Sequence, residues 1–176
     1  TERVAQVARA IAQALNPALL SRRDFEYSLL LHDLGKIGIA EDLLQKAGKL
    51  SDAEWETVKS HSELGARLLS SVRFLAPALA AVRSHHERFD GKGYPDGLRG
   101  EEIPLTARII AVADAFEAMI SDRPYRKGLS LAEARDQIKA NSGTQFDPEV
   151  VGAFLDAWQR IEAQANQADA TGQAMS

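Results

Sequence analysis

The sequence predicts an all-α fold, a compact multi-helix bundle in one domain. Three observations predict it. Apolar residues recur at helical spacing along most of the chain, the alternation typical of strands is almost absent, and two Ser-x-x-Glu capping boxes mark helix starts. The length of 176 residues suits one domain with a sizeable core.

Before residue 90, four helices are predicted from apolar spacings of three and four. Asn16-Pro17 ends the first helix, the capping residue Ser51 opens the third, and Pro77 suits the first turn of the fourth. The third carries His61, and Gly65 one turn later permits a close approach. These helices are expected over residues 4–15, 24–33, 51–68 and 77–86.

From residue 90 to 104, four glycines and two prolines predict an irregular loop. The next helix, residues 105–120, is apolar almost all round yet contains Asp114, and a buried carboxylate is costly unless a cation or hydrogen-bond donors meet it. A capping box at Ser130 and the pair Asp147-Pro148 each begin a further helix. Residues 1–165 are expected to form the domain and 166–176 a polar, frayed tail.

Composition excludes several classes of function. With 21 Lys and Arg against 25 Asp and Glu, the net charge of -4 provides no global basic field for a nucleic acid polymer, so an anionic substrate must be attracted locally. The absence of cysteine excludes disulfides and thiolate metal sites. No apolar run reaches the roughly 18 residues that a membrane span needs, and no signal-peptide pattern opens the sequence, so we expect a cytoplasmic location.

The histidines and two carboxylates predict a metal site. Any one of them alone would more simply be a hydrogen-bonded core or surface residue, but together they favour metal binding. Nitrogen and oxygen donors without sulfur suit iron, manganese or zinc in an open geometry. The carboxylate next to the first histidine has two oxygens and could bridge two cations. The set is His32, Asp33, His61, His85, His86 and Asp114.

Other polar residues lie where a phosphate or a base could meet them. Lys36 follows Asp33 by one turn, so its ammonium could meet a phosphate held by the metals, although it could equally be a solvated lysine. Arg123 and Arg126 could clamp a second phosphate or merely cover a surface. Tyr94 could stack on a base or only pack against the glycine loop.

Taken in order, these motifs resemble the HD-GYP domain, a branch of the HD phosphohydrolase superfamily, and the resemblance extends to about Trp158. The segments that carry it are His32-Asp33-Leu34-Gly35-Lys36, His61, His85-His86-Glu87-Arg88-Phe89-Asp90-Gly91-Lys92-Gly93-Tyr94-Pro95, Ile103-Pro104 through Ala113-Asp114, Arg123-Pro124-Tyr125-Arg126 and Gly143-Thr144-Gln145-Phe146-Asp147-Pro148. The resemblance implies an HD-superfamily helical bundle with an irregular Gly-Tyr-Pro loop.

The resemblance also implies a function, the hydrolysis of cyclic di-GMP through linear pGpG to GMP by a hydroxide that bridges two divalent metals, iron or manganese. A third metal occurs in some members. The implied ligands of the first metal are His32, Asp33 and Asp114, and those of the second are Asp33, His61, His85 and His86. The implied catalytic residues are Asp33 and Lys36, and the implied substrate contacts are Lys36, Tyr94, Arg123 and Arg126.

One departure concerns the first helix. The family has another histidine ligand just ahead of the segment that matches Thr1-Glu2-Arg3-Val4, and a glutamate one turn further upstream supports a third metal in some members. The sequence begins after both positions, so we expect a first helix truncated at its start. Glu2 should point away from the site and not replace the histidine. A weakly filled first site and a filled second site are therefore expected.

The resemblance further implies an upstream sensor or receiver domain, a GGDEF diguanylate cyclase partner and a homodimer. Two alternatives stay open. One is a module that binds cyclic di-GMP or a diguanylate cyclase without turnover, which the intact ligand set disfavours. The other is an HD-type hydrolase of a different cyclic dinucleotide or of a nucleoside triphosphate. The loop around Tyr94 favours a cyclic dinucleotide but does not separate guanine from adenine.

Overall fold

The computed structural model describes residues 2–122 and 127–173, with side chains through residue 167. Within those residues the chain forms α-helices and four short 3-10 helices but no strand, which confirms the predicted all-α fold. The α-helices are α1 (Glu2–Leu15), α2 (Arg23–Leu31), α3 (Glu41–Leu44), α4 (Asp52–Lys59), α5 (His61–Ser70), α6 (Leu79–Ser84), α7 (Leu105–Ile120), α8 (Leu131–Ala140), α9 (Pro148–Asp156) and α10 (Trp158–Gln173). The 3-10 helices cover Pro17–Ser21, Leu34–Gly38, Arg73–Ala78 and Gly100–Glu102.

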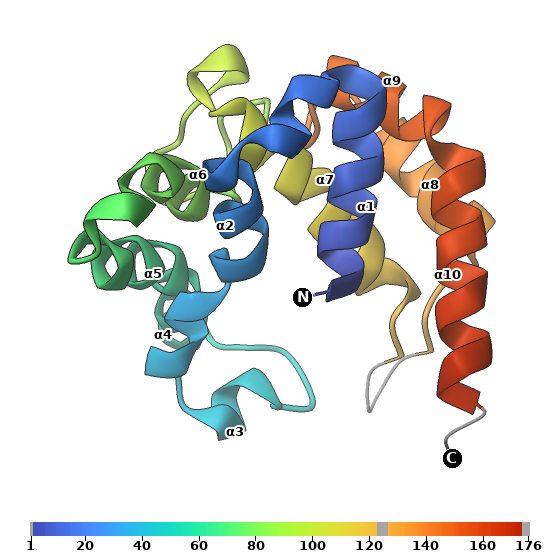
Figure 1. The fold of residues 1–176 in the computed structure, drawn as a ribbon. Coiled ribbons are helices and arrows are strands. Elements are labelled where there is room, and N and C mark those ends of the chain that lie inside the picture. Colours follow the sequence, from blue (N-terminus) through green and yellow to red (C-terminus); the bar gives the residue numbers. More distant parts are fainter. Residues whose placement is uncertain (1, 123–126, 174–176) are drawn as a thin grey trace.

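Helices α1 and α7 lie side by side at the centre of the molecule (Figure 1). Helices α8, α9 and α10 gather on one side of this pair, and α2 with α4, α5 and α6 gather on the other. Since α7 contacts α1 and α8 on one side and α2 and α6 on the other, it connects the two groups. Any residue on α7 is therefore held in a fixed position relative to both.

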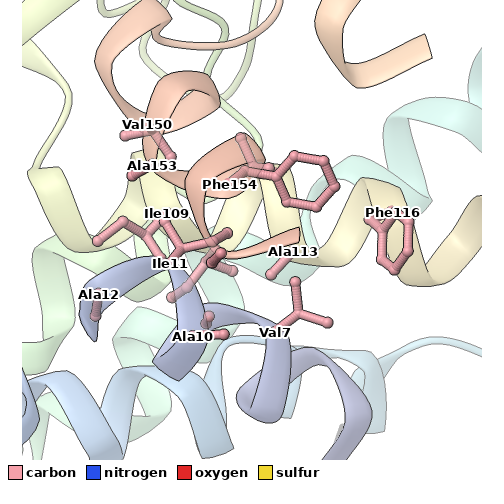
Figure 2. Close-up of a cluster of buried hydrophobic side chains, with 14 of the residues drawn as sticks. Val7, Ala10, Ile11, Ala12, Ile109, Ala113, Phe116, Val150, Ala153 and Phe154 are labelled. Carbon is pink, nitrogen blue, oxygen red and sulfur yellow. The ribbon is translucent and has the colours of Figure 1, made fainter. Parts of the chain in front are cut away.

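The main hydrophobic core forms between α1, α7 and α9, where Ile11, Ile109 and Phe154 are fully buried (Figure 2). Phe116 of α7 meets the ring of Phe154 edge-on, with the ring centroids 5.4 Å apart. Aromatic pairs in this geometry add about 0.5–1.5 kcal/mol beyond their buried area. This packing fixes the rotation of α7 and hence the direction in which its polar face points.

Several predicted elements match the structure. Helix α7 spans residues 105–120 as expected, and α1 ends at Leu15, next to Asn16-Pro17. Both capping boxes form: the hydroxyls of Ser51 and Ser130 accept the backbone N–H three residues on. The loop of residues 90–104 is irregular except for the 3-10 turn Gly100–Glu102. None of the described helices is long and apolar enough to cross a bilayer.

The helix predicted over residues 51–68 is wrong as one element, because the chain breaks at Ser60 into α4 and α5. The Ser60 hydroxyl donates to the carbonyl of Thr57 (2.7 Å), a local bond that competes with regular helix geometry. The break frees the carbonyl of Val58 to accept a hydrogen bond from the ring of His61 (2.6 Å). The site histidine thus begins a helix.

Further helix limits differ from the predictions. Helix α2, expected to run to residue 33, ends at Leu31. The helix expected over residues 77–86 is shorter: Pro77 lies in a 3-10 helix, α6 ends at Ser84, and His86 lies beyond the helix. The final helix is divided at Ala157, which separates α9 from α10. Residues 166–173, expected to be frayed, continue α10 to Gln173.

Candidate metal centre

The predicted ligands come from places far apart in the sequence that the fold brings together. His32 ends α2, Asp33 follows it, and His61 begins α5. The pair His85-His86 follows the last turn of α6. Asp114 reaches the same place from the middle of α7, opposite the helix face that packs in the core.

Asp33 lies between two groups of nitrogen donors. Its Oδ1 is 3.5 Å from Nε2 of His61 and 3.9 Å from Nε2 of His85. Its Oδ2 is 3.6 Å from Nε2 of His32, which in turn lies 4.0 Å from Oδ1 of Asp114. Each carboxylate oxygen therefore faces a different group, as a bridging ligand must.

The donor atoms form two clusters that could each hold a metal ion. In each cluster all donor atoms lie within 4.8 Å of one another, and the clusters share one carboxylate. They are Asp33, His61, His85 and His86, and His32, Asp33 and Asp114. These are the two sets that the resemblance to the HD-GYP domain implies.

Three of the imidazoles are oriented in the same way, by a bond from Nδ1 to the backbone carbonyl three residues earlier. The pairs are His32 with Leu29 (2.9 Å), His61 with Val58 (2.6 Å) and His85 with Val82 (2.7 Å). Each carbonyl lies in the last turn of a helix, where carbonyls lack the regular partner four residues on. Because a carbonyl only accepts, Nδ1 carries the proton, and Nε2 presents its lone pair to the centre of the site.

The crowding of these nitrogens favours a cation. The Nε2 atom of His61 lies 3.3 Å from that of His85 and 3.1 Å from that of His86. Burial lowers the pKa of His61 and of His85, and burial together with the charge of His61 lowers the pKa of His86 to about 3. Since Nδ1 carries the proton in His61 and in His85, their Nε2 lone pairs face one another at neutral pH, and a metal ion would bind both.

Comparison with known proteins agrees with this geometry. The model of the family described as "HD domain" matches residues 1–150. The chain belongs to the HD domain family. The family match and the relatives named cyclic di-GMP phosphodiesterases together confirm the resemblance.

The curated relatives are longer chains that match this one over part of their length. The cyclic di-GMP phosphodiesterase response regulator RpfG of Xanthomonas campestris is 44% identical over 92% of this chain. The 3'3'-cGAMP-specific phosphodiesterase 3 of Vibrio cholerae is 37% identical over 89% of it. This chain spans 43% and 34% of their respective lengths. The crystal structure of the V. cholerae cyclic GMP-AMP phosphodiesterase V-cGAP3 superposes on 99% of this chain and 47% of its own, with a TM-score of 0.74 and 21% identity, and so shows the same fold.

The two carboxylates of this HD domain differ in their electrostatics. Burial would raise the pKa of Asp33, but the charges of His32 and Lys36 and the Lys36 hydrogen bond together lower it. Burial and the charge of Asp33 raise the pKa of Asp114. Asp33 therefore stays ionised in the metal-free site. The ionised form of Asp114 is the one that a nearby cation would stabilise most.

Lys36 lies at the edge of the cluster. Its Nζ is 2.6 Å from Oδ2 of Asp33, while 38% of its side chain stays exposed. The ammonium thus meets both the metal ligand and the solvent from which a substrate would arrive.

Tyr94 lies against the metal ligands. Its ring stacks on the imidazole of His86, with centroids 4.9 Å apart and an interplanar angle of 28°. Burial and the nearby carboxylates of Asp114 and Asp33 raise the pKa of its hydroxyl, so the group stays protonated and can donate a hydrogen bond. Arg123 and Arg126 lie outside the described residues.

Two residues without a predicted role also build the site. A Cβ on Gly35 would lie 1.9 Å from the carbonyl oxygen of His61, so only glycine lets the 3-10 helix after Asp33 pack onto α5. The sequence analysis singled out Gly65, which lies on the other side of this contact. A Cβ on Gly65 would lie 3.2 Å from the nitrogen of Gly35.

Glu87 is buried, and its Oε1 accepts the backbone N–H groups of Asp96 (2.7 Å) and Gly97 (3.0 Å). These hydrogen bonds connect the loop beyond Tyr94 to the histidine pair.

Proposed function

We propose that this chain is the catalytic domain of a metal-dependent phosphodiesterase that hydrolyses cyclic di-GMP to pGpG and GMP. The observation that carries the proposal is the position of Asp33, whose two oxygens face two different groups of donors. A carboxylate shared between two clusters is the arrangement of two-metal hydrolases of phosphate esters. The relatives named for cyclic di-GMP supply the substrate class.

The donor set fits two divalent cations, with iron or manganese as the proposed identities. All donors are imidazole nitrogens or carboxylate oxygens, and the sequence has no cysteine. Two such cations, when bound, supply Lewis acidity that activates water and offsets the charge of a phosphate. We propose His32, Asp33 and Asp114 as ligands of the first, and Asp33, His61, His85 and His86 as ligands of the second.

Two residues at the edge of the cluster would bind the scissile phosphate. The ammonium of Lys36 can exchange the Asp33 carboxylate for a phosphoryl oxygen and so stabilise the negative charge of the transition state. The protonated hydroxyl of Tyr94 can donate to a second oxygen, while its ring keeps the imidazole of His86 in place. Arg123 and Arg126 stay proposed substrate contacts.

A second candidate substrate is 3'3'-cGAMP, because a relative named for it is 37% identical over most of this chain. Both cyclic dinucleotides contain the same phosphodiester linkage, so the metal site does not discriminate between them. Discrimination has to come from residues that contact the bases. The regulatory domain, the GGDEF partner, the homodimer and the cytoplasmic location stay expectations of the resemblance.

The test is to purify the protein without oxygen, load it with Fe(II) or Mn(II), count the metals and separate the products by chromatography. Cyclic di-GMP, pGpG and 3'3'-cGAMP are supplied in parallel, with Asp33→Asn as the inactive control. We expect GMP to accumulate from cyclic di-GMP in the wild type only. Intact dinucleotides in the presence of two bound metals would refute the proposal and favour a binding module.

A further inference from the structure

A cavity of about 200 Å³ opens beside the candidate metal centre, between α7 and the segment that precedes α9. Three proposed metal ligands, His85, His86 and Asp114, belong to its lining, and so do Arg88 and Gln145, which have no role in metal binding. At about 30 Å³ per water molecule, the cavity holds roughly seven waters. Ligand pockets of about 300–1,000 Å³ hold whole small molecules, so this volume suits one part of a ligand, such as a single nucleobase.

The α7 side of the cavity is lined by small side chains. Ala111 and Ala115 are one helical turn apart, and Asp114 lies between them on the same face. All three are partly exposed, whereas their neighbours Val112 and Ala113 are buried in the core on the other face. Two methyl groups provide an apolar surface suited to the flat face of a base.

The backbone around Gln145 is fixed. Its carbonyl accepts the N–H of Phe89 (3.1 Å), and the carbonyl of Thr144 accepts the N–H of Asp90 (2.8 Å). The next residue, Phe146, is buried in the main core. In contrast, the Gln145 carboxamide makes no hydrogen bond to any other described residue, although it is only partly exposed. An amide with free donor and acceptor groups, on a backbone that is held in place, therefore lines the cavity.

Charge favours a neutral base over a phosphate in this cavity. The guanidinium of Arg88 is already paired with both oxygens of Asp90 (3.0 and 2.8 Å), so its charge is compensated and its plane is fixed. The carboxylates of Asp114 and Glu87 also belong to the lining. An uncharged heterocycle needs no free positive charge in the lining, and guanidinium groups pack well on base faces.

We propose that this cavity is a nucleobase subsite of the phosphodiesterase and that Gln145 recognises the base that occupies it. A carboxamide presents one donor beside one acceptor, which matches the N1–H and O6 edge of guanine and, when flipped, the N6–H and N1 edge of adenine. The subsite therefore accepts a purine of either kind next to the scissile phosphate. The inference rests on the proposed function for its substrate class.

The test compares Gln145→Met, which keeps the volume but removes both hydrogen-bonding groups, with Gln137→Met on the exposed face of α8 as the matched control. Binding of GMP and of inorganic phosphate to the metal-loaded protein is measured by calorimetry, with kcat/KM for cyclic di-GMP. Two neutral hydrogen bonds contribute about 0.5–1.5 kcal/mol each, so we expect Gln145→Met to weaken GMP about tenfold relative to phosphate and to lower kcat/KM similarly. Metal content should match the wild type in both variants.

Three outcomes separate the two proposals. Unchanged GMP affinity in Gln145→Met would overturn the subsite. Equal weakening of GMP and phosphate would also overturn it, because Gln145 would then act through the metal centre. If the metal-loaded wild type leaves cyclic di-GMP intact but its GMP affinity still depends on Gln145, the proposed function fails while the subsite stands.

Discussion

Gly35 is the residue whose substitution should disturb the metal centre most without removing a ligand. It lies two residues after Asp33, in the 3-10 helix that packs on α5. A Cβ at this position would lie 1.9 Å from the carbonyl oxygen of His61 and 2.6 Å from the nitrogen of Gly65. Both are backbone atoms, so no side-chain rotation relieves the clash.

The required displacement can be worked out from these distances. Ordinary van der Waals contact begins at 3.4 Å, so the two segments in Gly35→Ala must separate by about 1.5 Å. Metal sites tolerate only about 0.2 Å in ligand distance. Because Asp33 lies on one of these segments and His61 on the other, we expect metal affinity to fall by at least about 10- to 100-fold. Overpacking should also lower the free energy of unfolding by about 1–3 kcal/mol.

Metal content by mass spectrometry, urea unfolding and kcat/KM for cyclic di-GMP check this prediction together. The matched control is Gly152→Ala on the exposed face of α9, where a Cβ meets nothing within 4 Å. That change should keep full metal content and stabilise the protein by about 0.5–1 kcal/mol. If Gly35→Ala retains wild-type metal content and activity, the close packing of the two segments does not position the site.

Three other predictions concern charge. Asp33→Asn should lose most bound metal and all activity while the helical fold remains by circular dichroism, and normal metal stoichiometry would contradict the bridging role. Lys36→Met should keep both metals but raise the activation barrier by about 2–4 kcal/mol, seen as a lower kcat/KM, and an unchanged value would remove Lys36 from phosphate binding. In the metal-free protein, the pKa of His86 is lowered to about 3 against about 6.5 in the unfolded chain, so the unfolded state binds more protons between these values. Stability should therefore fall as pH drops below about 6.5, and urea titrations that show no such fall would contradict the neutral, buried imidazole.

The elements that the sequence predicted well are those whose signals are local. Helix α7 was predicted to its last residue because it is apolar on nearly every face and is preceded by Pro104. The capping box at Ser51 was predicted equally well, since it spans only four residues. The break at Ser60 was missed because no glycine or proline marks it, and the apolar spacing of α4 continues into α5.

The site was predictable in its residue types but not in its supporting contacts. Histidines beside carboxylates indicated metal chemistry, and the resemblance to the HD-GYP domain divided them into two sets. The contact between Gly35 and His61 joins residues 26 positions apart in the sequence, so no local pattern indicates it. The same holds for Gln145, which reaches the cavity only because its backbone pairs with Phe89.

The missed helix boundaries are the ones that make the metal site. His32, His61 and His85 each follow the last turn of a helix and donate Nδ1–H to a carbonyl that a longer helix would have used itself. Had α4 run on through residue 68, the carbonyl of Val58 would accept a backbone N–H instead, and His61 would lose its orientation. The breaks also bring three helix C-termini, with their partial negative charge, to one place. Ligand orientation and electrostatic attraction for cations therefore arise from the same feature, the early ends of α2, α4 and α6.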